Sequence, residues 1–176
     1  MARVILRLSL LCVFLTCTTQ NNDTDYLLPV SLIPDQYEVT LSPILSELTF
    51  EGQVLIHGTA ERTVTTVTLN ADGLNITSAE VYDEEYRAIV VKEVECYDER
   101  CHLQLEYPLV AETRYSVELG FNGSIRRRQG IYTDKYLDSD GKWHKVVMTD
   151  FQPVHARKAF PCFDEPSYKA QFLLRV

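Results

Sequence analysis

Apolar and polar residues alternate along much of the chain with a period of two. The alternation is clearest over residues 37–41, 54–60, 103–107 and 115–121, where every second residue is apolar or small. This period is typical of β-strands that bury one face and expose the other. No stretch shows a strong helical period. The pattern therefore predicts a fold built from strands.

Further strands and turns are predicted between these segments. Residues 63–69 are rich in β-branched side chains, and residues 89–91 form a short apolar run that is typical of a strand covered on both faces. Turn signals, each ending in glycine, fall at residues 72–73, 122–123 and 140–141. Many short strands separated by turns predict an all-β fold, with antiparallel sheets arranged as a sandwich or a saddle.

The segment 148–170 differs from the rest because it is dense in prolines and charged residues. Pro153, Pro161 and Pro166 exclude a central strand, since proline has no N–H to donate to a neighbouring strand. A short helical turn fits between Pro153 and Phe160. We therefore expect a rigid, bent connection between two strands. A simpler interpretation is a buried structural loop whose charges pair with each other.

This connection reads D-F-Q-P-V-H-A-R-K-A-F-P-C-F-D-E-P over residues 150–166. It resembles the signature near the end of the N-terminal domain of the zinc aminopeptidases related to aminopeptidase N. Residues 34–43, P-D-Q-Y-E-V-T-L-S-P, and residues 50–56, F-E-G-Q-V-L-I, resemble earlier motifs of the same domain. The resemblance covers residues 28–176. It implies an all-β N-terminal domain that is incomplete, because the family continues with further strands after residues 171–176.

The resemblance implies a function in which zinc-activated water removes N-terminal amino acids from peptides, so peptide substrates are the expected partners. The family holds its zinc with an H-E-x-x-H motif on a helix and a further glutamate downstream. None of the four histidines of this chain begins such a motif, and the family's amine-binding G-A-M-E-N loop is absent. We therefore expect no catalytic residue, metal or other cofactor in this chain, which lacks the zinc domain and is inactive alone.

The resemblance also implies which residues shape the pocket for the first residue of the substrate. These are Asp150 and Gln152, both of which accept hydrogen bonds. The Gln152 carbonyl oxygen can accept one from an ammonium group, worth about 1.5–3 kcal/mol when water is excluded. The alternative for both residues is a solvated strand end without a binding role.

The charged pairs of the connection are expected to be structural. Arg157 forms an ion pair with Asp164 or Glu165 that holds the loop together. The sequence leaves open which of the two carboxylates is the partner.

Three cysteines, Cys96, Cys101 and Cys162, lie after residue 20. Cys96 and Cys101 flank four residues between two strand-like runs, so we expect a disulfide that closes this hairpin tip and stabilises the fold by about 2 kcal/mol. Cys162, between a proline and a phenylalanine, is expected to be a buried, inert thiol rather than a nucleophile.

The N-terminus has the pattern of a secretory signal. Two arginines precede an apolar run over residues 8–15 that is too short to span a bilayer. We expect residues 1–20 to be a cleaved signal peptide, residues 21–27 to be flexible and residues 28–176 to be the β-domain. An uncleaved anchor is the alternative. The mature chain is then secreted and has no membrane segment, while full-length relatives can also lie at the cell surface.

Three N-x-S/T triplets, at Asn22, Asn75 and Asn122, fit glycosylation of a secreted surface. Asn122 is the strongest candidate because Gly123 indicates an exposed turn.

Acidic residues outnumber basic ones, and the formal net charge is -8. This balance disfavours nucleic acid and anionic membranes as partners.

Asp134, Asp138 and Asp140 indicate a hairpin turn rather than a calcium site, because position twelve of an EF-hand loop that starts at Asp138 is a threonine. Trp143 is expected to anchor the strand that follows this turn.

Two other classes of protein remain open. One is a non-catalytic secreted β-sandwich that binds a peptide or a protein, and the other is an extracellular adhesion sandwich, which leaves the match at residues 150–166 unexplained. An open reading frame that continues to H-E-x-x-H would identify a fragment, whereas a stop codon after Val176 would favour the binding module.

The apolar residues Phe172, Leu174 and Val176 are expected at an open sheet edge, which promotes self-association or binding of a protein partner.

Overall fold

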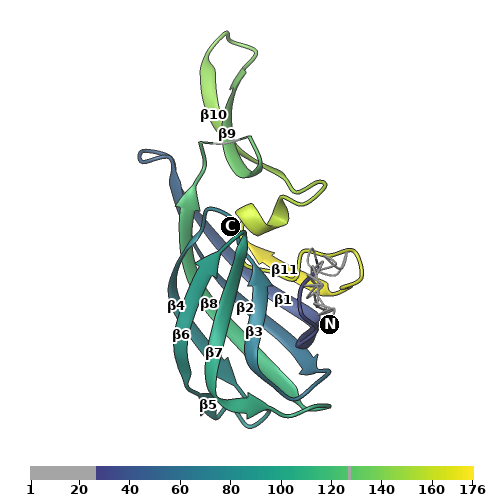
Figure 1. Ribbon diagram of the computed structural model, residues 1–176. Coiled ribbons are helices and arrows are strands. Elements are labelled where there is room, and N and C mark those ends of the chain that lie inside the picture. The colour runs from purple at the N-terminus through teal and green to yellow at the C-terminus, as the bar shows by residue number, and fades with distance from the viewer. Residues whose placement is uncertain (1–26, 127) are drawn as a thin grey trace, which may run out of the picture.

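The computed structural model describes residues 27–126 and 128–176, so the expected signal peptide and Asn22 lie outside the described residues. The described residues form strands and one short 3-10 turn, η2 (Figure 1). In chain order these are β1 (Leu32–Ile44), β2 (Thr49–Ala60), β3 (Val64–Asn70), β4 (Asn75–Tyr82), β5 (Ala88–Ile89), β6 (Val91–Tyr97), β7 (Arg100–Leu109), β8 (Arg114–Ser124), β9 (Gly130–Leu137), β10 (Trp143–Asp150), η2 (Ala156–Lys158) and β11 (Gln171–Arg175).

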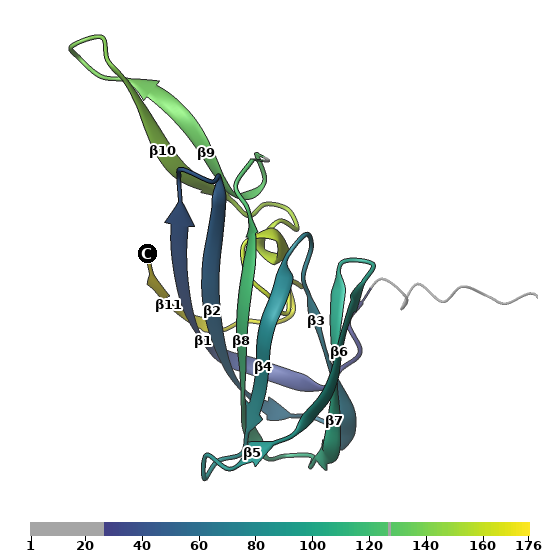
Figure 2. The ribbon, with the colours of Figure 1, turned by 90° about the vertical axis from the view of Figure 1, so that its left-hand side faces the viewer.

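Two sheets form a sandwich, which Figure 2 shows edge-on. The larger sheet has the strand order β11-β1-β2-β8-β4-β5, and the smaller has the order β3-β7-β6. Hydrogen-bonded neighbours run antiparallel, except that β11 lies parallel to β1. The all-β prediction is confirmed. In the described part of the chain, no helix is long and apolar enough to cross a membrane.

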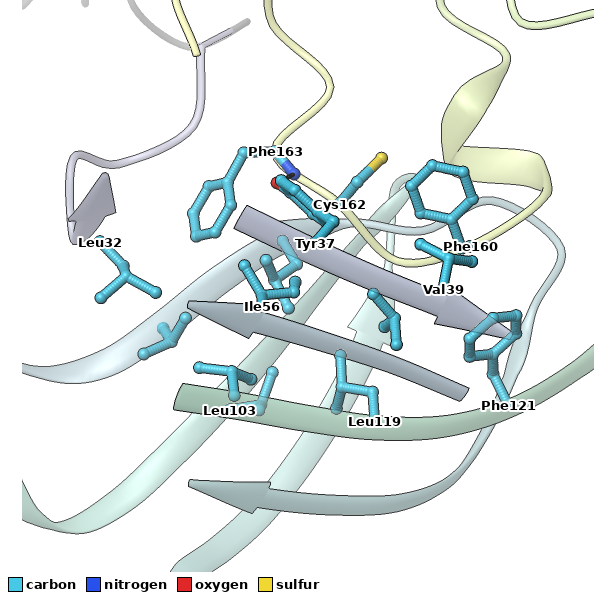
Figure 3. Packing of buried hydrophobic residues seen from close by; sticks show 14 of the residues in the cluster. Leu32, Tyr37, Val39, Ile56, Leu103, Leu119, Phe121, Phe160, Cys162 and Phe163 are labelled. Carbon is cyan, nitrogen blue, oxygen red and sulfur yellow. Dashed lines mark hydrogen bonds between the residues drawn. The ribbon is translucent and has the colours of Figure 1, made fainter. Parts of the chain in front are cut away.

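The core lies between the two sheets and follows from the period of two. Every second residue of the central strands points inward and is fully buried, while its neighbours face solvent. Figure 3 shows how side chains from both sheets interdigitate. The contributing residues include Val54 and Ile56 of β2, Val117 and Leu119 of β8, Val67 and Leu69 of β3, and Leu103 and Leu105 of β7.

The prediction for residues 89–91 is wrong. Ile89 ends β5 in the larger sheet and Val91 begins β6 in the smaller one, so the chain crosses between the sheets at Val90. The side chain of Val90 is exposed. The apolar run therefore supplies partly buried side chains to two different layers instead of one doubly covered strand.

The prediction of a turn at residues 122–123 is also wrong. Asn122 and Gly123 lie inside β8, opposite Glu51 and Phe50 of β2. A Cβ atom on Gly123 would come within 2.7 Å of the Phe50 ring. Glycine is needed here because an aromatic ring from the next strand lies against its backbone.

The β9–β10 hairpin extends beyond the sandwich as a two-stranded ribbon (Figures 1 and 2). Its turn lies at residues 138–142, where Gly141 has a φ of +76°, so the turn prediction is confirmed here. The Asp138 carboxylate accepts hydrogen bonds from the backbone N–H groups of Asp140 and Lys142. Trp143 begins β10, but its side chain is 65% exposed, so it does not anchor the strand by burial.

Candidate functional site

The connection that carries the signature begins where β10 ends at Asp150. The peptide between Gln152 and Pro153 is cis. The chain then forms η2, which confirms the helical turn predicted between Pro153 and Phe160. The N–H of His155 donates to the Phe151 carbonyl at 2.9 Å, which closes the first bend. The segment is therefore a compact, internally hydrogen-bonded loop.

Aromatic packing anchors this loop to the core. Phe160 and Phe163 are buried, and Figure 3 shows both rings near Tyr37 of β1. The Phe160 ring meets Phe151 edge-on at 5.9 Å and Tyr37 at 6.4 Å, measured between ring centroids. Such edge contacts add to the stabilisation from apolar burial. The phenol of Tyr37 also accepts a hydrogen bond from the Phe163 N–H at 3.1 Å.

Asn70, at the end of β3, binds the same loop through its backbone and its side chain. Its N–H and carbonyl exchange hydrogen bonds with Cys162 at 2.8 and 3.0 Å. Its side-chain oxygen accepts a hydrogen bond from the Asp164 N–H at 3.0 Å. The loop is therefore tied to the smaller sheet as well as to β1.

Arg157 connects η2 to the later part of the loop and to the β6–β7 turn. Its Nε donates to the Asp164 carboxylate at 2.9 Å, and a terminal nitrogen donates to Glu99 in the β6–β7 turn at 3.2 Å. The exposed fractions of the Arg157 and Asp164 side chains are only 13% and 15%. Glu165 instead accepts a hydrogen bond from the backbone N–H of Leu28. Of the two candidate partners, the structure thus pairs Arg157 with Asp164, and it adds Glu99, which sequence reasoning missed.

Lys158 ties the loop to the base of the ribbon. Its Nζ lies 3.3 Å from an Asp72 carboxylate oxygen and donates to the Gln129 side chain at 2.6 Å. Gly130, which has a φ of +72°, opens β9 directly beside it, and a Cβ atom there would come within 2.7 Å of the Lys158 Cβ. Only glycine combines this close approach with the left-handed backbone.

Asp150 and Gln152 lie at this base, and both side chains are exposed. The Gln152 N–H contacts an Asp150 carboxylate oxygen at 3.4 Å, so the two residues are held next to each other. Together they present a carboxylate and an amide carbonyl, which are groups that accept hydrogen bonds from a cation. Asp150 lies opposite Gly130, so its position depends on the ribbon and on the contacts of Lys158.

The cysteines divide into a bonded pair and a buried thiol. Cys96 and Cys101 form a disulfide across the tip of β6 and β7. Cys162 is a free, buried thiol, and its burial raises the pKa of the thiol group well above its ordinary value. A thiol that stays protonated is a poor nucleophile, so Cys162 belongs to the packing of the loop.

The donor groups do not fit a zinc ion. Among the described residues, His, Cys, Asp and Glu side chains form no group of three or more that could hold a metal. The Asp138 carboxylate is instead hydrogen-bonded to the backbone N–H groups of Asp140 and Lys142 and lies 2.5 Å from His144 Nε2. No chemical step through a metal is therefore assigned to this chain.

Two glycosylation candidates are cross-strand neighbours. Asn75, the exposed first residue of β4, lies opposite Asn122 of β8. Asn122 is partly buried in the middle of the sheet, so Asn75 is the more accessible of the two.

Comparison with known sequences places this geometry in context. Residues 33–176 match the family described as the Peptidase M1 N-terminal domain. Endoplasmic reticulum aminopeptidase 1 of Homo sapiens is 29% identical over 85% of this chain and 16% of the relative. Membrane alanyl aminopeptidase of Manduca sexta is 31% identical, and Aminopeptidase M1 of Arabidopsis thaliana is 32% identical, each over 85% of this chain and 17% of the relative. The chain thus spans about one sixth of the length of these relatives.

Proposed function

This chain belongs to the family of peptidase M1 N-terminal domains, and on that premise we propose that it is the N-terminal domain of a secreted zinc aminopeptidase. The whole enzyme would remove N-terminal amino acids from peptides. In that arrangement the zinc ion and the attacking water belong to a catalytic domain outside this sequence. The aminopeptidase names of the relatives support the proposal.

The role of this domain would be to help recognise the N-terminal residue of the peptide. One observation carries this proposal: Asp150 and Gln152 present two adjacent, exposed acceptors at the base of the ribbon. The free N-terminus of a peptide is an ammonium group, and hydrogen bonds between such a cation and a carboxylate or carbonyl are among the stronger ones in proteins. The acceptors would form one wall of a pocket that the catalytic domain completes.

The rigidity of the loop supports this role. The contacts of Arg157, Asn70 and Tyr37 hold the loop on three different strands or turns. A binding group that is already held in place loses less conformational entropy when the ligand arrives.

A hybrid enzyme tests the recognition role. The N-terminal domain of an active relative is replaced by residues 28–176, and Gln152→Ala is compared with Gln53→Ala, which removes an exposed amide from β2. We expect Gln152→Ala to lower kcat/KM for aminoacyl substrates about 10-fold or more, because the hydrogen bond to the ammonium is lost. Equal kcat/KM values for the two variants would contradict the assignment.

The place of the chain in a larger protein is tested separately. Sequencing of the transcript beyond Val176 would reveal whether the reading frame continues to H-E-x-x-H. The purified chain by itself is expected to bind no stoichiometric zinc and to cleave no aminoacyl substrate. Zinc at one ion per chain, with turnover that a chelator abolishes, would contradict this expectation.

We also propose that the protein is secreted after cleavage of its signal peptide and that it is glycosylated. The N-terminus of the protein recovered from the medium of a secretory host should fall near residue 21. Glycopeptide mapping of Asn22, Asn75 and Asn122 should find sugar on at least one of the three. An unprocessed chain that carries no sugar and stays in the cell would contradict both expectations.

The exposed strand β11 is a proposed site of association. It forms one edge of the larger sheet, and its residues Phe172 and Leu174 are exposed, as is Val176 directly after it. Phe172 stacks on Tyr37 with ring centroids 4.7 Å apart, yet most of its surface stays in contact with water. An open edge with apolar side chains favours pairing with another chain. Light scattering should therefore show self-association of the purified chain.

A further inference from the structure

The two faces of the β9–β10 ribbon carry different chemistry. One face continues outward from the core, because Ile131 and Val147 near the base pack against the buried cluster. Farther out on that face lie two cross-strand pairs, which we call the lysine face: Lys135 opposite Lys145, and Leu137 opposite Trp143. All four of its side chains are exposed.

The lysine pair is electrostatically unusual. Residues that lie directly opposite on antiparallel strands have Cβ atoms about 4.5–5.5 Å apart, and two like charges at this spacing repel each other. Within the described part of the chain, no ion pair joins either ammonium group to a carboxylate. This uncompensated positive charge lies on a protein with a net charge of -8.

On the opposite face of the ribbon, charged and aromatic side chains have partners within the chain. There Asp134 forms an ion pair with Arg128 at 2.6 Å, and Tyr136 stacks on His144 with ring centroids 5.4 Å apart. His144 in turn contacts the Asp138 carboxylate. Charged and aromatic groups on this face have partners inside the chain, whereas those of the lysine face have none in the part that the structure describes.

The apolar pair beside the lysines is also open to solvent. The side chains of Leu137 and Trp143 are 53% and 65% exposed. Consecutive positions on one face of a strand are about 7 Å apart, which follows from the rise of 3.2–3.4 Å per residue. A positive pair and an apolar pair therefore lie one repeat apart on a surface that extends beyond the sandwich (Figure 2).

We propose that the lysine face is a docking surface for an acidic protein segment in extended conformation. The segment would place a carboxylate between Lys135 and Lys145, and a leucine-sized or aromatic side chain two residues away against Leu137 and Trp143. A carboxylate between the two ammonium groups removes their mutual repulsion and adds charge-assisted hydrogen bonds. The apolar contact excludes water from the two exposed side chains.

The overall charge favours a protein segment over an anionic membrane. A membrane surface would meet the whole acidic domain, and that long-range repulsion opposes binding. A single extended segment needs to approach only the ribbon, which stands clear of the sandwich (Figure 1).

Trp143 provides a direct readout, because it is the one tryptophan of the sequence. The full chain from a secretory host is titrated with an acetylated twelve-residue peptide that alternates glutamate with leucine. We expect a saturable shift of the tryptophan emission to shorter wavelength, and an affinity that falls as salt is added. A peptide that alternates lysine with leucine should give no saturable shift.

Charge reversal locates the site. Lys135→Glu with Lys145→Glu should weaken binding at least about 10-fold, whereas the control Lys92→Glu with Lys169→Glu makes the same change in net charge elsewhere and should leave the affinity within about 2-fold. If the reversed protein does not melt cooperatively, Lys135→Gln with Lys145→Gln replaces it, with an expected loss of at least about 3-fold.

The proposal is overturned by equal binding of both peptides, by equal loss in test and control variants, or by no saturable shift. It is also overturned if phosphatidylserine vesicles produce the shift and the acidic peptide does not.

Discussion

The hydroxyl oxygen of Tyr37 accepts a hydrogen bond from the backbone N–H of Phe163 at 3.1 Å, although 126 positions separate the two residues. Both side chains are buried, and burial raises the pKa of the Tyr37 phenol. One polar atom of β1 thus satisfies a backbone donor in the middle of the signature loop. The loop that carries the candidate recognition residues is therefore attached to β1, which lies between β11 and β2 in the larger sheet.

Tyr37→Phe removes only this hydroxyl. The Phe163 N–H would then be buried without an acceptor, so we expect a loss of about 1–3 kcal/mol in the free energy of unfolding. The control is Tyr107→Phe, because Tyr107 is 65% exposed. Denaturant titration of both variants measures the difference. Equal unfolding midpoints would show that water satisfies the N–H of Phe163.

Arg157→Ala should destabilise the domain more than any exposed arginine does. It leaves the Asp164 carboxylate, 15% exposed, without its cation, and breaking a buried pair in this way costs about 3 kcal/mol. Arg128, which is 74% exposed and pairs with the 36% exposed Asp134, is the control, and Arg128→Ala should leave the melting temperature nearly unchanged. Thermal unfolding compares the two. Similar melting temperatures would mean that the Arg157 contacts add no net stability.

Lys135→Glu should stabilise the ribbon. It converts a like-charge pair with Lys145 into an opposite-charge pair, which is worth about 0.5 kcal/mol on antiparallel strands. Hydrogen exchange of the β9 and β10 amides reports this local change, because the ribbon can open without unfolding the sandwich. Slower exchange in the ribbon and unchanged exchange in β2 and β8 is the expected result, and faster exchange in the ribbon would contradict it.

The hairpin turn should open in acid. Hydrogen bonds from the Lys142 backbone, and then from the His144 side chain, hold the pKa of Asp138 below its ordinary value of 3.8. Because the folded-state pKa is lowered, the carboxylate stabilises the turn at pH values above 3.8, and this stabilisation is lost as the pH falls through the folded pKa. The emission of Trp143, next to the turn, should change in this acid range. Asp138→Asn should abolish that transition, and an unaltered transition in the variant would assign it to another group.

Cys162 should resist alkylation in the native protein. Its buried thiol stays protonated and out of reach, whereas an engineered exposed thiol, Ser167→Cys, should react readily. Denaturation should make Cys162 reactive, and peptide mapping without reduction should recover Cys96 linked to Cys101. A native Cys162 that reacts as fast as the engineered thiol, or that is recovered in a disulfide, would contradict the packing of the loop.

Much of the secondary structure could be read from the chain itself. The period of two at residues 37–41, 54–60, 103–107 and 115–121 corresponds to β1, β2, β7 and β8, because alternation is a local property of an extended backbone with one buried face. The turn predicted at residues 72–73 is also confirmed, because the chain bends there between β3 and β4, and Gly73 and Gly141 both adopt a positive φ. The motif at residues 150–166 located the loop and, through its prolines, its irregular backbone.

The tertiary structure decided which neighbour each residue meets. Gly123 looked like a turn residue, but the Phe50 ring of an adjacent strand accounts for the glycine. Arg157 could have paired with either nearby carboxylate, and it was the position of the β6–β7 turn that brought in Glu99. Spacing along the chain determines which face of a strand a side chain occupies. Contacts between distant residues arise only once the strands have paired and the sheets have packed, and no local pattern in the sequence records that arrangement.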